Sequence, residues 1–435
     1  MNIILLSGGS GKRLWPLSNN VRSKQFIKIF KKENGEYESM IQRMYRMIKT
    51  VDENAVITIA TSKSQVSSIH NQISSDVGIS VEPTRRDTFP AMALASAYLH
   101  DVKNVSIDET VLVCPVDPYV EQDFFKALKA LSNIADNKEY NLSLMGITPT
   151  YPSEKYGYII PEGVDNVSRV SCFKEKPDSK TAEEYIKQGA LWNSGVFAFK
   201  LEYLLRKSKD LFGTCEYKYL FDNYDKLTKI SFDYAVVEKE NDIQVMRFNG
   251  KWKDLGTWNT LAESMSDTYV GDVILNDNCD NVRVINELDT PILAMGLKDV
   301  VISASPNGIL VSDMSESSYI KPYVDKIDDR IMFAEKSWGY FKIIDVGQNS
   351  LTIKVTLNIG HKMNYHSHQN RDEIWTITAG IGEVNIDGEI IPVKSGDTIT
   401  MKAGCKHTIL AKTELQLIEV QIGEDISVSD KIKYN

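Results

Sequence analysis

Apolar and polar positions in the first part of the chain alternate between short continuous apolar runs and stretches with helical spacing. The apolar runs predict buried strands over 2–7, 55–60 and 109–117. Apolar positions that recur with helical spacing predict helices over 37–49, 87–100 and 124–135. Strands that alternate with helices predict an α/β fold, in which a mixed, mostly parallel, Rossmann-like sheet is covered by helices on both faces.

The pattern changes after residue 265. Residues 266–330 contain short β runs broken by Gly, Asn and Asp, without helical spacing, and are expected to form a β-rich connector. Residues 331–435 continue as short strands with glycine-containing turns, which is typical of an all-β sandwich or barrel. Because 435 residues exceed one ordinary core, we expect three parts: 1–265, 266–330 and 331–435.

Composition narrows the function classes. Hydrophobic residues make up 42% and charged residues 25%, as in ordinary globular proteins, and no apolar run approaches the roughly 20 residues that span a bilayer. A net charge of −9 gives no overall attraction to nucleic acid or anionic lipid, so we expect neither as a partner. Five scattered cysteines without paired spacing indicate a reduced, cytoplasmic chain without a disulfide framework.

The first candidate site follows the first predicted strand, where Gly8, Gly9, Ser10 and Gly11 precede two cations. Backbone amides in such a turn can converge on a phosphate, and Arg13 and Lys24 favour a polyphosphate ligand. Asp117 ends another predicted strand, where a carboxylate is a natural Mg²⁺ ligand. Taken alone, a structural turn and a helix cap remain open alternatives for these residues. Parallel strands would place both features at one edge of the sheet.

Several further motifs follow in order along the chain. They are EPTRRDTFPAMALA (82–95), VCPVDPYV (113–120), GITPTYPSEKYGYI (146–159), FKEKPD (173–178), LWNSGVFAF (191–199), FDYAVVEK (232–239) and WKDLGTW (252–258). Together with GGSGKRLWPLS, this series resembles the sugar-phosphate nucleotidyltransferases. The closest resemblance is to the branch in which a mannose-1-phosphate guanylyltransferase is fused to a phosphomannose isomerase.

The resemblance implies roles for individual residues. The glycine loop and the two cations after it would bind the triphosphate: Gly8, Gly9, Ser10, Gly11, Lys12 and Arg13. Lys24 would neutralise the departing pyrophosphate, and Glu82 and Pro83 would lie against the base. Asp117 and Asp254 would hold Mg²⁺. The sugar phosphate would be contacted by Gly157, Glu175, Lys176 and Asn193.

The implied reaction is nucleotidyl transfer from GTP to mannose 1-phosphate, giving GDP-mannose for polysaccharide synthesis. Four positions depart from the family pattern: Lys12, Ser23, Asp87 and Pro118. They leave another sugar 1-phosphate, such as a heptose, or another nucleotide as an alternative. A non-enzymatic sugar-nucleotide sensor is a third reading, and retention of all the catalytic cations and carboxylates argues against it.

The second candidate site lies near the carboxyl terminus. His366 and His368 are two residues apart and would share one face of a strand, and Glu373 and His407 add two more ligands. Core or surface roles are the alternative for an isolated pair of histidines. The spacing of all four residues favours a divalent ion such as Zn, Mn, Co or Fe.

This spacing resembles the cupin superfamily, and KSWGYFKII (336–344), RDEIW (371–375) and LIEVQIGEDISVSD (417–430) resemble the isomerase half of the fused family. The resemblance implies aldose–ketose isomerisation, with Arg371 holding or polarising the sugar phosphate or enediolate. Three positions depart from the pattern: His366, the pair Gln369-Asn370, and Lys402. Isomerisation of another sugar phosphate, or binding alone, therefore stays open. The connector is a candidate surface for a homo-oligomer.

Overall fold

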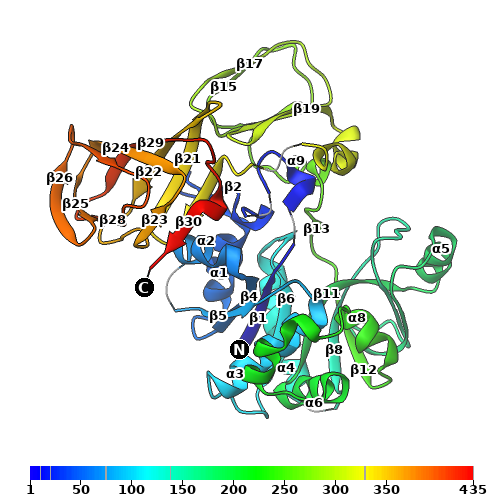
Figure 1. Cartoon of the computed structure of the whole chain (residues 1–435). Helices are drawn as coiled ribbons and strands as arrows, with labels where there is room; N and C mark the ends of the chain where they lie inside the picture. The colour runs from blue at the N-terminus through cyan, green and yellow to red at the C-terminus, as the bar shows by residue number, and fades with distance from the viewer. Residues whose placement is uncertain (10, 20, 74–75, 138, 328–329, 435) are drawn as a thin grey trace. The chain divides into compact units, whose positions relative to one another are not determined.

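The computed structural model describes residues 1–435 except 10, 20, 74–75, 138, 328–329 and 435 (Figure 1). The chain divides into two compact units. The first contains Met1–Ser10, Ser23–Val66 and Gln72–Ser266, and the second contains Gly11–Arg22, Ser67–Asn71 and Asp267–Asn435. These units differ from contiguous segments that end at 265 and 330, because Gly11–Arg22 packs with residues beyond Asp267. The three expected domain bounds stay a prediction.

A nine-stranded sheet with the order β5-β4-β1-β6-β11-β8-β12-β10-β9 forms the centre of the first unit. Its strands are β1 (Asn2–Ser7), β4 (Val56–Ser62), β5 (Gly78–Glu82), β6 (Thr110–Pro115), β8 (Leu142–Ile147), β9 (Tyr158–Pro161), β10 (Val167–Lys174), β11 (Leu191–Lys200) and β12 (Ile243–Phe248). β1 is parallel to β4 and β6, and β4 is parallel to β5, whereas β11 is antiparallel to β6 and β8. The carboxyl ends of four parallel strands therefore lie at one edge.

Helices cover both faces of this sheet. The helices of the first unit are α1 (Met40–Val51), α3 (Thr88–Asp101), α4 (Gln122–Asp136), α5 (Ser179–Lys187), α6 (Leu201–Phe212), α7 (Tyr217–Asp222), α8 (Phe232–Ala235) and α9 (Trp258–Ala262). Most of α2 (Val66–Gln72) belongs to the second unit. Ile4 and Val111 share a core with buried side chains of α3 and α6. Because side chains alternate along a strand, Leu5 and Leu112, which are also buried, face the other side and need a second helical layer. The expected α/β architecture is confirmed, but the sheet is not mostly parallel. β12 is parallel to β8, whereas β10 is antiparallel to β12 and β9, so the half of the sheet beyond β6 is mainly antiparallel.

The predicted elements agree with the observed ones to within a few residues. β1 coincides with the predicted strand 2–7, and α3 with the helix over 87–100, shifted by one residue. The helix expected from 37 begins at Met40, because Tyr37–Ser39 forms strand β3. Ser39 caps α1 and exchanges hydrogen bonds with Gln42, so the capping box sets where this helix starts.

Two short ladders complete the first unit. β2 (Lys28–Lys31) pairs with β3, and β7 (Pro118–Val120) pairs with β13 (Trp252–Asp254), both antiparallel. In the second ladder Asp254 lies opposite Pro118, which follows Asp117 directly. This ladder joins two segments that are distant in the sequence.

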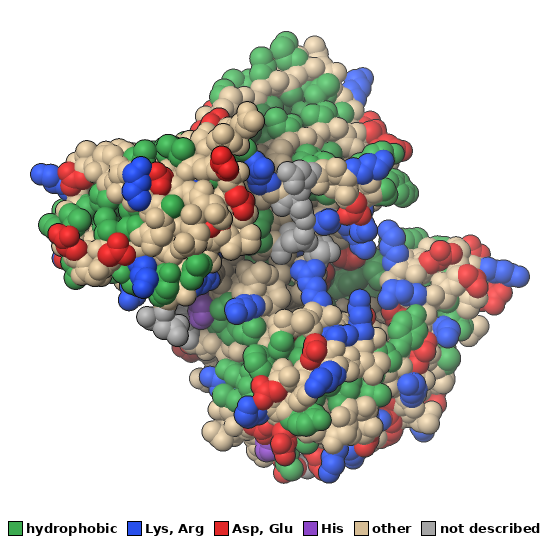
Figure 2. Space-filling view, in the orientation of Figure 1, with side chains coloured by type: hydrophobic (Ala, Val, Ile, Leu, Met, Phe, Trp, Pro, Cys, Tyr) green, Lys and Arg blue, Asp and Glu red, His purple; other side chains and the backbone are tan. Residues whose placement is uncertain are grey.

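The connector is built from two small sheets. One contains β14 (Tyr269–Val270), β16 (Arg283–Asn286), β18 (Val300–Ser305) and β19 (Gly308–Asp313), and the other contains β15 (Val273–Leu275) and β17 (Ile292–Ala294). The pairings are parallel except between β18 and β19. Apolar side chains also remain exposed here: Ile274, Leu293, Met295, Ile309 and Val311. Figure 2 shows hydrophobic side chains gathered on the surface of this region. Self-association through them stays a prediction.

The last part of the chain forms two antiparallel sheets around one core. Their strands are β20 (Phe333–Lys336), β21 (Gly339–Val346), β22 (Ser350–Leu357), β23 (His366–His368), β24 (Arg371–Ala379), β25 (Ile381–Ile386), β26 (Glu389–Lys394), β27 (Thr398–Met401), β28 (His407–Ala411), β29 (Leu415–Gly423) and β30 (Lys431–Lys433). Trp375, Leu357 and Leu417 lie in the core between the sheets. The expected cupin-like barrel is confirmed. None of the helices in the described part of the chain has the length and apolar character needed to cross a membrane.

Residues Gly11–Arg22 are anchored within the second unit. The Arg22 guanidinium donates to both carboxylate oxygens of Glu287, at 2.6 and 2.9 Å. Ser305 Oγ donates to the Pro16 carbonyl at 2.8 Å. Because the guanidinium is nearly buried, its two charge-assisted hydrogen bonds fix the end of this segment.

We expect Glu287→Ala to destabilise the second unit by about 1.5–3 kcal/mol, because it removes both charge-assisted hydrogen bonds of the largely buried Arg22 guanidinium. Urea unfolding is the measurement. Asp289→Ala is the matched control: its carboxylate pairs with Lys342 at 2.9 Å but is 94% exposed, so its loss should change stability far less. Equal effects of the two substitutions would contradict the anchoring role of Glu287.

Candidate active site

Two carboxylates and one lysine meet at the carboxyl edge of the first sheet. Lys24, the first residue of η2 (Lys24–Phe26), places its Nζ 2.9 Å from Asp117 Oδ2 and 3.8 Å from Asp254 Oδ1. The same ammonium donates to the Leu255 carbonyl at 3.1 Å. The β7–β13 ladder brings the two aspartates together, because it sets Asp254 beside the residue that follows Asp117.

This pair suits a cation. Asp117 and Asp254 are 40% and 38% exposed, so both carboxylates remain within reach of a ligand. The surrounding protein desolvates Asp117 and would raise its pKa, but the Lys24 ammonium outweighs this and lowers the pKa. Ionised carboxylate oxygens are the ligands that Mg²⁺ prefers, so the donor set fits this ion.

The glycine loop follows β1 at the same edge. Gly8 and Gly9 are exposed, and Gly9 adopts φ +118°, a conformation that favours glycine. The Gly9 carbonyl accepts from Arg85 Nη2 at 3.3 Å. A bare, solvent-facing backbone is what close approach of a phosphate requires.

The remaining residues of the predicted loop either belong to the second unit or lie outside the described residues. Ser10 lies outside them. Gly11 opens the short helix η1 (Gly11–Leu14) in the second unit, which also carries Lys12 and the exposed Arg13. Lys12 Nζ donates to Asp325 Oδ1 at 3.1 Å. Lys12 is thus engaged in an ion pair within the second unit, a contact that the sequence did not indicate.

The predicted base-binding residues end a neighbouring strand. Glu82 is the last residue of β5 and accepts from the Tyr224 hydroxyl at 2.8 Å, and Pro83 after it is exposed. Burial raises the pKa of Glu82. Asp87, which departs from the family pattern, caps α3 by accepting from the Thr88 amide at 2.8 Å.

Four predicted sugar-binding residues form one cluster. The Asn193 amide donates to the Gly157 carbonyl at 2.8 Å, and a Cβ on Gly157 would lie 2.5 Å from Glu175 Oε2. Glycine at 157 therefore leaves the space that the Glu175 carboxylate needs. Lys176 Nζ forms a close ion pair with Glu175, and its residue adopts φ +47°, which is uncommon for a lysine.

Two further side chains border this cluster, and the sequence reasoning assigned neither of them. Asp233 accepts from Asn193 Nδ2 at 2.7 Å. The Tyr156 ring lies between Trp192 and Trp252, at centroid distances of 4.9 and 5.6 Å. Asp233 belongs to the FDYAVVEK motif, so the sequence could have indicated it as a site residue.

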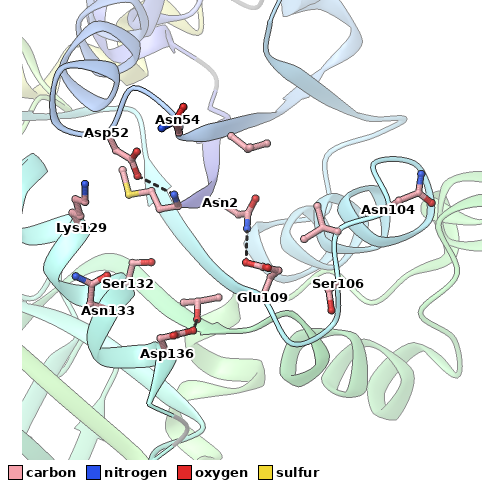
Figure 3. Close-up of a pocket in the computed structure, with 14 residues that line it drawn as sticks. Asn2, Asp52, Asn54, Asn104, Ser106, Glu109, Lys129, Ser132, Asn133 and Asp136 are labelled. Carbon is pink, nitrogen blue, oxygen red and sulfur yellow. Dashed lines mark hydrogen bonds and ion pairs between the residues drawn. The ribbon is translucent and has the colours of Figure 1, made fainter.

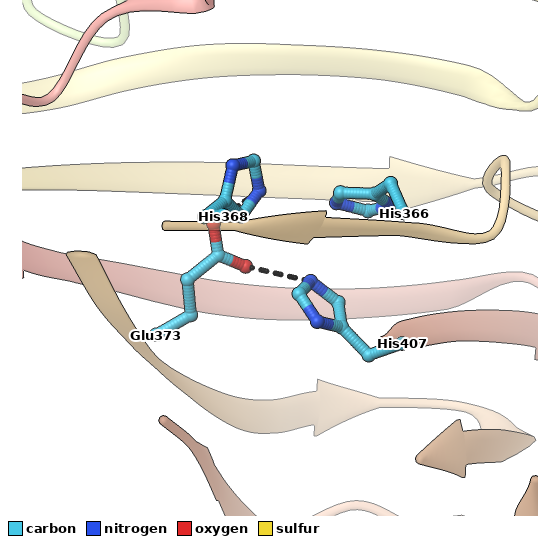
Figure 4. A group of neighbouring side chains, drawn as sticks. All are labelled: His366, His368, Glu373 and His407. Carbon is cyan, nitrogen blue, oxygen red and sulfur yellow. Dashed lines mark ion pairs between the residues drawn. The ribbon is translucent and has the colours of Figure 1, made fainter. Parts of the chain in front are cut away.

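The second candidate site lies inside the barrel, where His366, His368, Glu373 and His407 are all buried (Figure 4). Their ligand atoms lie within 4.8 Å of one another. Glu373 Oε1 is 3.0 Å from His368 Nε2, and Glu373 Oε2 is 3.2 Å from His407 Nε2. The register of β23 against β28 sets His366 opposite His407. The structure thus brings together all four residues that the spacing singled out.

The protonation of this group fits metal binding. His366 Nδ1 and His407 Nδ1 lie 2.6 and 3.1 Å from backbone carbonyls, which can only accept, so each Nδ1 carries the proton and each Nε2 offers a lone pair. Burial lowers the pKa of His366 to about 3. Burial alone would raise the pKa of Glu373, but hydrogen bonds and charge from His368 and His407 outweigh it and lower this pKa. Imidazole nitrogens and a carboxylate oxygen suit a divalent transition metal.

Buried polar residues surround this group. Arg371 donates to Asp430 Oδ2 and Glu373 Oε1, each at 3.4 Å, and so contacts the ligand group directly. Gln421 Nε2 donates to Glu373 Oε1 at 3.2 Å and to Glu419 Oε1 at 2.5 Å. Burial, followed by the nearby Glu373 carboxylate, raises the pKa of Glu419 to about 8. Sequence reasoning did not single out Glu419.

The first unit also carries a hollow of about 690 Å³ at the opposite edge of its sheet (Figure 3). It is lined by the beginnings of β1, β4 and β6, at Asn2, Val56 and Thr110. Its polar groups pair with one another: Asn2 Nδ2 donates to Glu109 at 3.5 Å, for example. Ligands of parallel α/β sheets bind at the carboxyl ends of strands, so this hollow is separate from the candidate site.

Comparison with known families and proteins adds independent findings. The family model described as nucleotidyl transferase matches residues 2–269, and the one described as mannose-6-phosphate isomerase C-terminal matches residues 328–435. Mannose-1-phosphate guanylyltransferase of Salmonella montevideo is 28% identical, with 99% of this chain and 98% of that protein covered. Xanthan biosynthesis protein XanB of Xanthomonas campestris pv. campestris (strain B100) is 29% identical, with 99% and 97% covered.

A solved structure is also similar. A crystal structure from Thermus thermophilus, described as a mannose-1-phosphate geranyltransferase, aligns with a TM-score of 0.61 and 25% identity. The alignment covers 75% of this chain and 98% of that chain. The similarity thus extends well beyond a single motif.

We expect the barrel to bind one Co²⁺ per chain, because three imidazoles and a carboxylate converge there. A visible absorption band during Co²⁺ titration and a higher melting temperature are the readouts. His407→Asn should weaken binding at least about tenfold. His361→Asn is the control, since His361 is an exposed histidine outside the group. Unchanged Co²⁺ affinity in the His407 variant would contradict the site.

Proposed function

Because this chain belongs to the nucleotidyl transferase family, we propose that it transfers the guanylyl group of GTP to mannose 1-phosphate, giving GDP-mannose and pyrophosphate. Guanosine and mannose are proposed from the Salmonella relative, which aligns over nearly the whole of both chains. The observation that carries the proposal is the contact of Lys24 with Asp117 and Asp254 at the carboxyl edge of the sheet. Another NTP or another sugar 1-phosphate is the alternative.

The reaction needs no nucleophile from the protein. A phosphate oxygen of the sugar 1-phosphate forms a bond to the α-phosphorus, and the bond from that phosphorus to the oxygen bridging to the β-phosphorus breaks. The electron pair leaves with pyrophosphate. Both reactants are anions, so catalysis consists of holding them together and offsetting charge as the bond breaks.

The chain supplies groups for each part of this task. The exposed backbone at Gly8 and Gly9 would receive the triphosphate, with Arg13 as a further cation, and Glu82 and Pro83 would lie near the base. Lys24 would neutralise the leaving pyrophosphate.

Asp117 and Asp254 would hold Mg²⁺, which supplies charge neutralisation at the phosphates when bound. The sugar would lie near Gly157, Glu175 and Asn193, and Lys176 would bind its phosphate. Lys176 suits this role because its side chain is half exposed and reaches past the buried Glu175.

Asp117→Asn and Asp254→Asn should each lower kcat for pyrophosphate release by about 100-fold or more, because each removes a charge from the cation site. Asp123→Asn is the control: it removes an exposed partner of Lys126 on α4 and should leave kcat unchanged. The assay pairs each of four NTPs with several sugar 1-phosphates. Faster turnover with another pair would favour the alternative substrates, and no turnover with any pair would refute the transferase proposal.

We also propose a second activity for the barrel: isomerisation between fructose 6-phosphate and mannose 6-phosphate. The buried His₃Glu group supports it, as does the match of residues 328–435 to an isomerase family model. His366, His368, Glu373 and His407 would hold Zn, Mn, Co or Fe, which polarises a sugar carbonyl when bound. Arg371 would orient the ligand group and the sugar phosphate.

Glu373→Gln should abolish conversion of fructose 6-phosphate, because it removes the charged ligand and leaves Arg371 without one of its acceptors. A coupled assay with added Mn²⁺, Co²⁺ or Zn²⁺ measures the reaction. The two sites serve as controls for each other: this variant should keep pyrophosphate release, and Asp117→Asn should keep isomerisation. Failure of the wild-type protein on every ketose phosphate tested would refute the isomerase proposal alone.

The reactants follow from these activities: a nucleoside triphosphate and a sugar phosphate. We propose the cytoplasm as the location, since all five cysteines are free. We also propose a homo-oligomer, which would form through the exposed apolar residues of the connector.

A further inference from the structure

We propose that Asp233 accepts a hydrogen bond from a ring hydroxyl of the sugar, and that Glu175 and Asp233 together select sugar 1-phosphates with two free hydroxyl donors. The proposal rests on the transferase function above and specifies the sugar site of that reaction. Glu175 was expected at this site from the family resemblance, whereas Asp233 was assigned no role.

The fold directs Asp233 toward the sugar cluster. Phe232, the residue before it, is buried among aromatic side chains, with its ring 4.8 Å from Phe197 and 6.0 Å from Phe89. The Phe232 amide donates to Thr88 Oγ1 at 2.9 Å. With Phe232 fixed in the core, Asp233 reaches Asn193, whose amide group donates to its carboxylate at 2.7 Å.

Two carboxylates therefore share one small region. Burial and the neighbouring Glu175 raise the pKa of Asp233 to about 6, while Lys176 and Asn193 act in the opposite direction. Lys176 pairs closely with Glu175, so this single ammonium faces two acids. Keeping two nearby acids partly desolvated is unfavourable without a donor between them, and such groups are concentrated at functional sites.

The chemistry of these groups points to a class of ligand. A carboxylate offers about four acceptor positions, and Asn193 satisfies one of those on Asp233. Neutral hydroxyl groups can donate to both acids at once, whereas a ring position without a hydrogen-bond donor leaves a carboxylate desolvated and unpaired. Specificity of this kind is strong, because a missing donor is penalised more than a missing methylene.

The cluster also adjoins the cation site. Burial, followed by Asp254 as the next cause, raises the pKa of Tyr156, so its hydroxyl lies within electrostatic reach of Asp254. Tyr156 precedes Gly157, and Trp192 precedes Asn193. A sugar bound near Glu175 and Asp233 would thus have an aromatic wall on the side that leads toward Asp254.

The test is Asp233→Asn, which keeps the size of the side chain and an oxygen that Asn193 can reach. We expect KM for mannose 1-phosphate to rise about tenfold or more with kcat changed little, because a charged acceptor becomes a neutral one. Asp222→Asn is the matched control: it removes an exposed partner of Lys218 at the end of α7 and should leave KM unchanged. An unchanged KM in Asp233→Asn would overturn the proposal.

A set of monodeoxy mannose 1-phosphates separates a hydroxyl contact from a structural role. The wild-type enzyme should bind one of these deoxy sugars about as weakly as the Asp233→Asn variant binds mannose 1-phosphate. When that deoxy sugar is tested with the Asp233→Asn variant, the loss of affinity should be no larger than either change causes alone. Additive losses for every deoxy sugar would mean that Asp233 acts on the fold alone, which would overturn the proposal.

Calorimetric binding of mannose 1-phosphate separates this inference from the transferase proposal. If the wild-type protein binds the sugar phosphate but turns over no NTP, the transferase proposal fails. The comparison of Asp233→Asn with Asp222→Asn then still decides the role of Asp233, since weaker binding in the first variant alone supports it. Equal binding by both variants would refute it.

Discussion

Repulsion between the carboxylates of Asp117 and Asp254 is the constraint around which the first unit is organised. Two like charges stay together only where a cation offsets them, and Lys24 does so from η2 while also donating to the Leu255 carbonyl. Its position requires β6 to end at this edge and the β7–β13 ladder to align Asp254 with the residue after Asp117. The same balance of charge that stabilises the pair of carboxylates also suits the Mg²⁺ and phosphate that we propose bind here.

In both proposed sites the chemistry and exposure of the donor atoms match the proposed metal, although the two environments differ. In the first unit the carboxylates are open to solvent, as suits a site that must admit and release two anions. Inside the barrel the proposed ligand group is buried, and backbone carbonyls lie within hydrogen-bond distance of Nδ1 of His366 and His407, which leaves Nε2 of each for the proposed metal. Hard oxygen donors at an open edge fit Mg²⁺, and buried imidazoles fit a transition metal.

The segment Gly11–Arg22 belongs to the second unit, although in the sequence it directly continues the glycine loop of the first. Its cations and Trp15 belong to the motif that resembles a nucleotide-binding signature. Arg22 is held by Glu287, and Lys12 by Asp325. Glu287 and Asp325 therefore hold both ends of the segment Gly11–Arg22 within the second unit, so the segment is not a free surface turn.

The sequence by itself determined the local elements and the residues at their ends. Continuous apolar runs located β1, β4 and β6, and the spacing of His366 and His368 placed both on one face of β23. Hydrophobic periodicity is a local property, so it can locate a strand end such as Asp117. Only the tertiary structure decided that Asp254 lies opposite the residue after Asp117, that Asp233 meets Asn193, and that Gly11–Arg22 packs with residues beyond Asp267. These contacts join residues far apart in the chain and depend on strand order and ladder register, which no local pattern encodes.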